Sequence, residues 1–84
     1  NIMMDDDVVE LSAADINALA ELFRRNGKVV QVDAKSNTLQ VVYPKGSARM
    51  DEINRFCFEN GIVLSHLMLR KKRLEARFFE LTNN

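Results

Sequence analysis

An internal sequence similarity, here called the internal echo, relates the two halves of this 84-residue chain and constrains its fold more than any other feature. At an offset of 34 residues, which aligns residue 16 with residue 50, the apolar positions of one predicted helix fall on those of a second. Each copy runs from a helix into a strand, which is not the pattern of stacked helix pairs. The chain therefore reads as two similar half-domains. The matching positions are Ile16, Leu19, Leu22 and Phe23 with Met50, Ile53, Phe56 and Cys57, then Asn26-Gly27 with Asn60-Gly61, and Val29-Val30 with Val63-Leu64.

The first half predicts a strand, a helix and a hairpin. Residues 8–11 form the strand, and Ser12 is the expected helix N-cap, with Asp15 in the capping-box position three residues later. The helix covers residues 13–26 and ends at Gly27. Residues 28–32 and 38–43 are rich in β-branched side chains, with turn residues between them, so they predict a β-hairpin.

The second half repeats the order and then adds a segment. Ser47 is the expected cap of a second helix, which ends at Gly61, and residues 62–70 form the final strand. Residues 73–81 predict a third helix. The whole pattern favours an α+β, ferredoxin-like split βαβ fold (β-α-β-β-α-β). It has four antiparallel strands, two helices on one face, and the C-terminal helix in addition.

Charge and cysteine content narrow the functional classes. Lys plus Arg and Asp plus Glu both number 12, so no global field draws the chain to nucleic acid or an anionic membrane. A single cysteine, Cys57, allows no internal disulfide and suits a reducing compartment. No apolar run approaches the roughly 20 residues that span a bilayer. Because the chain lacks an initiator methionine, we expect residues 1–84 to be a single small domain excised from a longer protein.

Groups that carry catalytic chemistry are sparse. The glycines stand singly at predicted helix ends and in a turn, whereas a phosphate-binding loop needs them clustered before a helix. A zinc site needs several ligands, and the chain has one cysteine and one histidine, Cys57 and His66. We interpret both as packing residues. The sequence predicts no catalytic residue, cofactor or metal in this domain.

Two other functions are found on this fold, RNA binding and the binding of a small regulatory ligand. RNA-binding modules place aromatic residues on the two central strands, here residues 8–11 and 38–43, where Tyr43 at a strand end is the only one. Small-ligand regulatory domains usually carry a polar elbow after the first strand, a place that Ser12-Ala13-Ala14 could take. The ligand-binding reading is the first alternative and the RNA-binding reading the second.

Two runs of like charge are candidate interaction sites. They are residues 5–7, all aspartate, and the basic run Arg70, Lys71, Lys72 and Arg73. In the predicted fold the last strand pairs antiparallel with the first, which brings the acidic run beside the basic run. We expect mutual neutralisation there, although exposed ion pairs contribute only about 0–1 kcal/mol each.

The final strand is apolar on both predicted faces. Simple alternation directs Ile62, Leu64 and Met68 to one face, and Val63, Leu67 and Leu69 to the other. We expect the closing helix to cover the second face with a stripe of Leu74, Phe78 and Leu81. Phe79 is turned by about 100° from Phe78 and is expected to remain available to a partner.

The closing residues 73–82, RLEARFFELT, resemble the ending common in ATP-binding subunits of bacterial ABC export-type transporters. There a small domain follows the nucleotide-binding domain and closes on a Ser-Leu-Glu-x-x-Phe-x-x-Leu-Thr pattern. Arg73 departs from that pattern, because it stands where the family has a capping serine and arginine cannot cap a helix. The matching residues are Leu74, Glu75, Phe78, Leu81 and Thr82.

The resemblance implies a parent protein that binds ATP and Mg²⁺ and hydrolyses ATP to drive export through a membrane permease subunit. Its catalytic motifs would precede Asn1, and this domain would be a non-catalytic regulatory or interaction domain. The partners implied are its own nucleotide-binding domain and a second ATP-binding subunit, with no nucleic acid. The location implied is cytoplasmic, at the inner face of the cell membrane through the parent complex.

Overall fold

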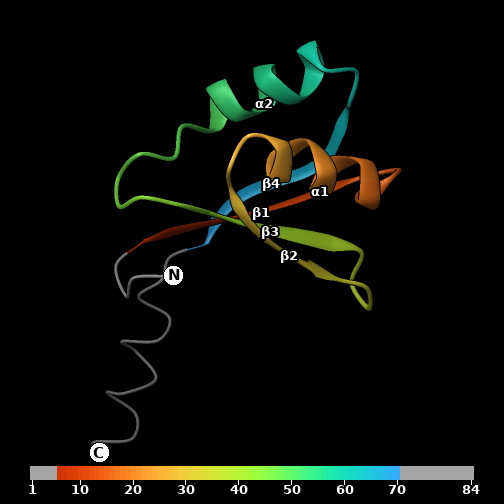
Figure 1. Cartoon of the computed structure of the whole chain (residues 1–84), viewed down its shortest axis with the longest axis horizontal. Coiled ribbons are helices and arrows are strands. Elements are labelled where there is room, and N and C mark those ends of the chain that lie inside the picture. Colours follow the sequence, from red (N-terminus) through yellow and green to blue (C-terminus); the bar gives the residue numbers. More distant parts are fainter. Residues whose placement is uncertain (1–5, 71–84) are drawn as a thin grey trace, which may run out of the picture.

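The computed structural model describes residues 6–70, which form one antiparallel sheet of four strands with two helices on one side of it (Figure 1). The strand order is β2-β3-β1-β4, so β1 and β3 are central. This is the predicted ferredoxin-like α+β fold. The predicted third helix, residues 73–81, lies outside the described residues. The elements are β1 (Asp7–Ala13), α1 (Ile16–Arg25), β2 (Val29–Asp33), β3 (Thr38–Tyr43), α2 (Met50–Glu59) and β4 (Leu64–Arg70).

The hydrophobic core lies between the sheet and the two helices. The central strands direct alternate residues toward the helices, as the two-residue period of a strand requires. Helix α1 packs across β1, β2 and β3, whereas α2 packs mainly on β4. The two helices therefore share one layer but contribute unequally to the core. Its buried members are Val9, Leu11 and Ala13 of β1, Leu39 and Val41 of β3, Leu19, Ala20, Leu22 and Phe23 of α1, and Ile53 and Cys57 of α2.

The start of α1 differs from the prediction. Strand β1 continues through Ser12 to Ala13, and the Ser12 hydroxyl donates a hydrogen bond to the backbone oxygen of Asn37 at 3.0 Å. The cap is Asp15, whose Oδ1 accepts from the backbone N–H of Ala18 at 3.1 Å. Ser12 was the wrong cap because cross-strand pairing extends the strand past it.

The start of α2 differs in the same way. The Ser47 hydroxyl donates to the backbone oxygen of Pro44 at 2.7 Å and so closes a turn instead of capping the helix. The N-cap position is Arg49, which makes no side-chain capping hydrogen bond. Because arginine carries only donors, it cannot accept from the free N–H groups of the first turn.

Both helices end on the same motif, as the internal echo predicts. The side-chain amides of Asn26 and Asn60 donate to the backbone oxygens of Leu22 at 2.9 Å and Phe56 at 2.8 Å. Gly27 and Gly61 follow with φ of 78° and 83°, a region that glycine enters without steric cost. The Asn-Gly pair therefore terminates each helix by the same local chemistry.

Strand β4 contains an irregularity that alternation alone did not predict. Ser12 pairs with His66 and Ala13 with Leu64, so β4 holds one extra residue, Ser65, opposite β1. This bulge reverses the alternation within β4, and Leu64, Leu67 and Leu69 all pack against the core on the helix side. The prediction that Leu64 faces away from Leu67 and Leu69 was therefore wrong.

The ends of the two charge runs lie at the same side of the sheet, where β1 begins and β4 ends (Figure 1). Val8 pairs with Arg70 in register, which places Asp7 next to that pair. Their side chains nevertheless use other partners. Asp7 Oδ2 accepts from the backbone N–H groups of Gly46 at 3.0 Å and Ala48 at 3.4 Å, and Arg70 pairs with Glu10. The remaining members of the basic run lie outside the described residues.

Candidate functional site

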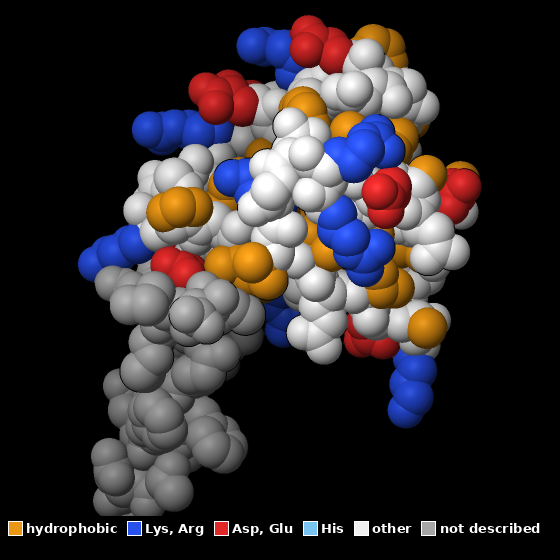
Figure 2. Space-filling view, viewed as in Figure 1, with side chains coloured by type: hydrophobic (Ala, Val, Ile, Leu, Met, Phe, Trp, Pro, Cys, Tyr) orange, Lys and Arg blue, Asp and Glu red, His pale blue; other side chains and the backbone are white. Residues whose placement is uncertain are grey.

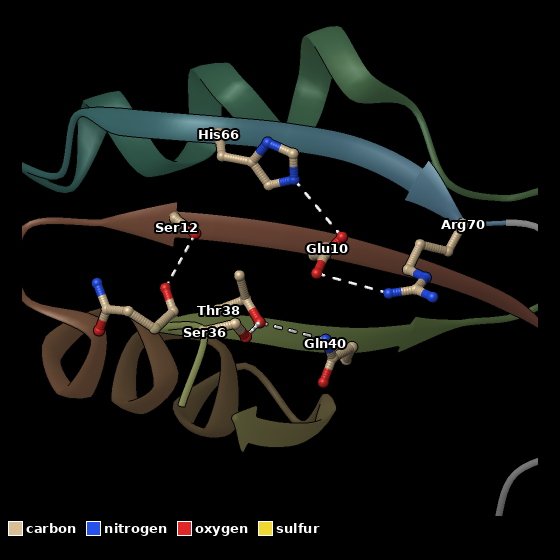
Figure 3. Close-up of polar contacts among 8 residues, drawn as sticks. Glu10, Ser12, Ser36, Thr38, Gln40, His66 and Arg70 are labelled. Atoms are coloured by element: carbon tan, nitrogen blue, oxygen red, sulfur yellow. Dashed lines mark hydrogen bonds and ion pairs between the residues drawn. The ribbon is translucent and has the colours of Figure 1, made fainter. Parts of the chain in front are cut away.

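The face of the sheet opposite the helices carries a polar cluster centred on Glu10 (Figure 3). Glu10 pairs in register with Met68, so its diagonal neighbours on β4 are His66 and Arg70. Its carboxylate lies 3.5 Å from His66 Nε2 through one oxygen and 3.5 Å from Arg70 Nη1 through the other. The Glu10 side chain is 15% exposed and both partners are 40% exposed, so the cluster is accessible from solvent.

A second polar group extends the same face across β3. The hydroxyls of Ser36 and Thr38 lie 2.7 Å apart, and Gln40 Nε2 donates to Thr38 Oγ1 at 3.5 Å (Figure 3). These side chains offer donors and acceptors in place of the stacking rings that the RNA-binding alternative requires. Tyr43 lies on the helix side of β3, where it lines a cavity between the helices.

Cys57 and His66 do not form a nucleophile–base pair. Cys57 is fully buried in the core on the helix side, whereas His66 belongs to the opposite face with Glu10. Burial raises the pKa of the Cys57 thiol to about 11. The thiol is therefore protonated at neutral pH, and a protonated thiol is a poor nucleophile. The structure agrees with a packing role for Cys57.

Apolar side chains gather beside the β4 edge of the sheet. In residues 6–70, β4 pairs only with β1 and leaves its other edge unpaired. Phe58 at the end of α2 is 69% exposed, and Val63, just before β4, is 72% exposed. A surface depression of about 540 Å³ lies between α2 and the start of β4. We call this region the β4-edge surface, lined by Asp51, Asn54, Arg55, Phe58, Val63 and Leu64.

A second hollow, of about 360 Å³, lies between α1 and α2 at the end of β3, and we call it the interhelical cavity. Sequence reasoning missed it, because its residues come from two segments of the chain, 23–28 and 43–56, that only the fold brings together. One signal was present: an arginine occupies the α2 cap position, where an oxygen-bearing side chain is preferred. The lining residues are Phe23, Asn26, Lys28, Tyr43, Ser47, Arg49, Glu52, Ile53 and Phe56.

The structure places one of the predicted interaction residues, Arg70, on the open face, bound to Glu10. The other predicted positions lie outside residues 6–70. Within that range, no three His, Cys, Asp or Glu side chains are grouped so that they could hold a metal ion. No helix in this part of the chain is long and apolar enough to cross a membrane. The positions outside the described range are Lys71, Lys72, Arg73, Leu74, Glu75, Phe78, Phe79, Leu81 and Thr82.

Known proteins were compared with the chain by sequence and by structure. No family model matches it, and no curated protein or solved structure matches it either.

Proposed function

We propose that this chain is a non-catalytic accessory domain of an ABC transporter ATP-binding subunit, which contacts and regulates its own nucleotide-binding domain. The observation that carries the proposal is the closing pattern of Leu74, Glu75, Phe78, Leu81 and Thr82. It follows β4, which ends at Arg70, and a strand also leads into the motif in the small domains that it resembles. The β-α-β-β-α-β order of residues 6–70 supports the same assignment.

In this proposal the chemistry belongs to the parent protein. ATP and Mg²⁺ bind upstream of Asn1, hydrolysis drives a separate membrane permease, and the accessory domain lies on the cytoplasmic side. We further propose that the β4-edge surface contacts the nucleotide-binding domain. Exposed phenylalanine and valine side chains beside an unpaired strand edge are costly to leave in water, so they favour a protein contact.

The coding sequence upstream of Asn1 gives the first test. A P-loop and an ABC signature motif there are the expected result, and their absence would refute the assignment. Labelled ATP provides a second test: the parent protein should retain it, and residues 1–84 alone should not. Saturable ATP binding by residues 1–84 at micromolar concentration would contradict the non-catalytic role.

The proposed contact is tested in the full-length parent. Phe58→Asp should separate one thermal unfolding transition into two, because a buried aspartate weakens the contact between the accessory domain and the core. Val29→Asp is the matched control, since Val29 is 46% exposed on β2 at the opposite edge of the sheet. If Phe58→Asp leaves one transition but dissociates a parent dimer, the surface binds a second copy and the proposed contact is wrong.

One observation favours the alternative, a small-ligand regulatory domain: the interhelical cavity between α1 and α2. The polar elbow considered for such a ligand is already engaged, because the Ser12 hydroxyl bonds to Asn37. An accessory domain that also binds a regulatory ligand would combine the two functions.

A further inference from the structure

The interhelical cavity has the size and lining of a small-molecule site. Its volume of about 360 Å³ falls in the range of roughly 300–1,000 Å³ that is usual for ligand pockets. Such pockets combine apolar walls with a few convergent polar groups. On the side of the molecule seen in Figure 2, basic and apolar side chains are interspersed over the layer that carries the helices.

The inner wall of the cavity is aromatic. The rings of Phe23 and Phe56 meet edge to face, with centroids 5.5 Å apart and an angle of 61° between their planes. Phe23 is 1% exposed and Ile53 is 4% exposed, so this wall is fixed by the core behind it. The Phe56 ring is partly exposed in front of them, so a flat apolar group can pack on it without reorganising the core.

Two cations stand at the rim. Lys28 Nζ lies 4.4 Å from the centroid of the Tyr43 ring, so an aromatic face holds the ammonium group in place. The Arg49 side chain forms no ion pair or hydrogen bond with any other described residue. One carboxylate, Glu52, also lines the cavity. With two cations and one anion, the lining carries a formal charge of +1.

The first turn of α2 presents backbone N–H groups at this rim and also carries two carboxylates, Asp51 and Glu52. Arg49 supplies no capping acceptor, and the Glu52 N–H is the one first-turn donor with a side-chain acceptor, Asp51 Oδ1 at 2.9 Å. The free N–H groups of a helix start attract negative charge, and the two carboxylates of this turn reduce that attraction, so the cations of the rim carry the binding of an anion. The half-buried Tyr43 phenol adds no competing charge, since desolvation raises its pKa to about 12.

We propose that the interhelical cavity binds a small organic monoanion, with its carboxylate between Lys28 and Arg49 and its flat apolar body against Phe56. Glu52 disfavours a dianion, so the site prefers a carboxylate to a phosphate ester. The proposal does not depend on the assignment to an ABC transporter. If that assignment fails, the cavity and its charges remain as described.

The test uses residues 1–84 and amide NMR titrations with phenylacetate. Saturable shifts are expected at Asn26, Lys28 and the first turn of α2. Phenylacetamide has the same shape without the charge and should bind about tenfold more weakly or worse, because it loses the charge-assisted contacts. Acetate lacks the ring and should show no saturable binding. Phenyl phosphate, as a dianion, should not bind more tightly than phenylacetate.

Substitutions of single cations distinguish binding in the cavity from a general effect of the net charge on phenylacetate affinity. Lys28→Met and Arg49→Gln should each weaken phenylacetate binding about tenfold while keeping a folded spectrum. Arg25→Gln is the matched control: Arg25 is an exposed cation on α1 that does not line the cavity. Absence of saturable shifts with phenylacetate, equal binding of the amide, or equal loss in the control would overturn the proposal.

Discussion

The two helices occupy equivalent places in the two halves of the fold, and yet they are anchored very differently. Helix α1 begins with a capping aspartate and buries four residues, whereas α2 begins with an uncapped arginine and buries two. Their C-termini are nearly the same, down to the asparagine side-chain bond and the glycine that follows. What differs is therefore the N-terminus and the amount of apolar surface removed from water.

The difference between the helices coincides with the location of the candidate sites. The interhelical cavity and the β4-edge surface both border α2. Segments that bind partners or ligands often belong to the less stable regions of a protein, because a fully packed element leaves little exposed surface for a contact. Helix α1 thus supplies the structural half of the layer, and α2 supplies the half available for recognition.

The largest expected effect comes from the pair of aromatic residues that joins the helices. Phe23→Ala removes a fully buried ring and should lower the free energy of unfolding by about 3–5 kcal/mol. Phe56→Ala removes a partly exposed ring at the cavity wall and should cost about 1–2 kcal/mol. Urea unfolding of both variants measures the difference. Equal losses would mean that α2 is as firmly packed as α1.

The second-largest effect is expected at alkaline pH, which should lower the free energy of unfolding. Burial raises the pKa of Cys57 from 9.0 to about 11 and contributes to raising that of Tyr43 from 10.0 to about 12. A raised folded-state pKa means that stability is intact below pH 9 and is lost as pH rises through 11. Full titration of Cys57 corresponds to a loss of about 2–3 kcal/mol.

Chemical denaturation between pH 7 and 11 checks the alkaline effect. Cys57→Val, which keeps an apolar side chain of similar size, should flatten the slope between pH 9 and 11. In the unaltered folded protein at neutral pH, a thiol reagent should react with Cys57 only as fast as the protein opens. Rapid labelling of the folded chain would contradict the buried placement of this residue.

Substitutions at the two helix N-caps should change the stability by smaller amounts and in opposite directions. Asp15→Ala removes the acceptor at the start of α1 and should cost about 1 kcal/mol. Arg49→Ser supplies α2 with the acceptor it lacks, at a residue whose φ of −119° and ψ of 110° suit a cap. It should add about 0.5–1 kcal/mol. Thermal melts of the two variants should therefore shift in opposite directions, and a destabilising Arg49→Ser would show that the arginine supports the helix in another way.

The smallest effect is expected at the β4-edge surface. Phe58 is mostly exposed, so Phe58→Ser should change the stability of residues 1–84 by less than about 0.5 kcal/mol. The same substitution should improve solubility at high concentration, because it removes an apolar group from water. Melting temperature and a concentration series by light scattering measure the two responses. A large loss of stability would mean that Phe58 packs within the domain and is not available to a partner.

Element order and helix ends could be predicted from the sequence because they depend on local chemistry. The Asn-Gly pairs at 26–27 and 60–61 fix the helix ends without help from the rest of the fold. The helix starts were missed because Ser12 and Ser47 each have another hydrogen-bond partner, which only the folded chain provides. The bulge at Ser65 was missed for a similar reason, since an extra residue shows only against the partner strand.

The candidate sites were less predictable than the fold. Arg70 was singled out from its basic run, but its partner Glu10 lies 60 residues earlier and is found only through strand register. The interhelical cavity joins Lys28, Tyr43 and Arg49, which have no common spacing or motif. A site made from the ends of several elements leaves little signal in a single sequence.

Amide hydrogen exchange on residues 1–84, with and without phenylacetate, tests the contrast between the helices most directly. Backbone amides of α1 near Phe23 should exchange only through global unfolding, whereas those of α2 near Phe56 should exchange through a local opening of lower free energy. Phenylacetate should raise the protection of α2 well above any change it makes in α1. Equal protection of both helices, unchanged by the ligand, would mean that α2 is anchored as firmly as α1 and that the interhelical cavity does not bind phenylacetate.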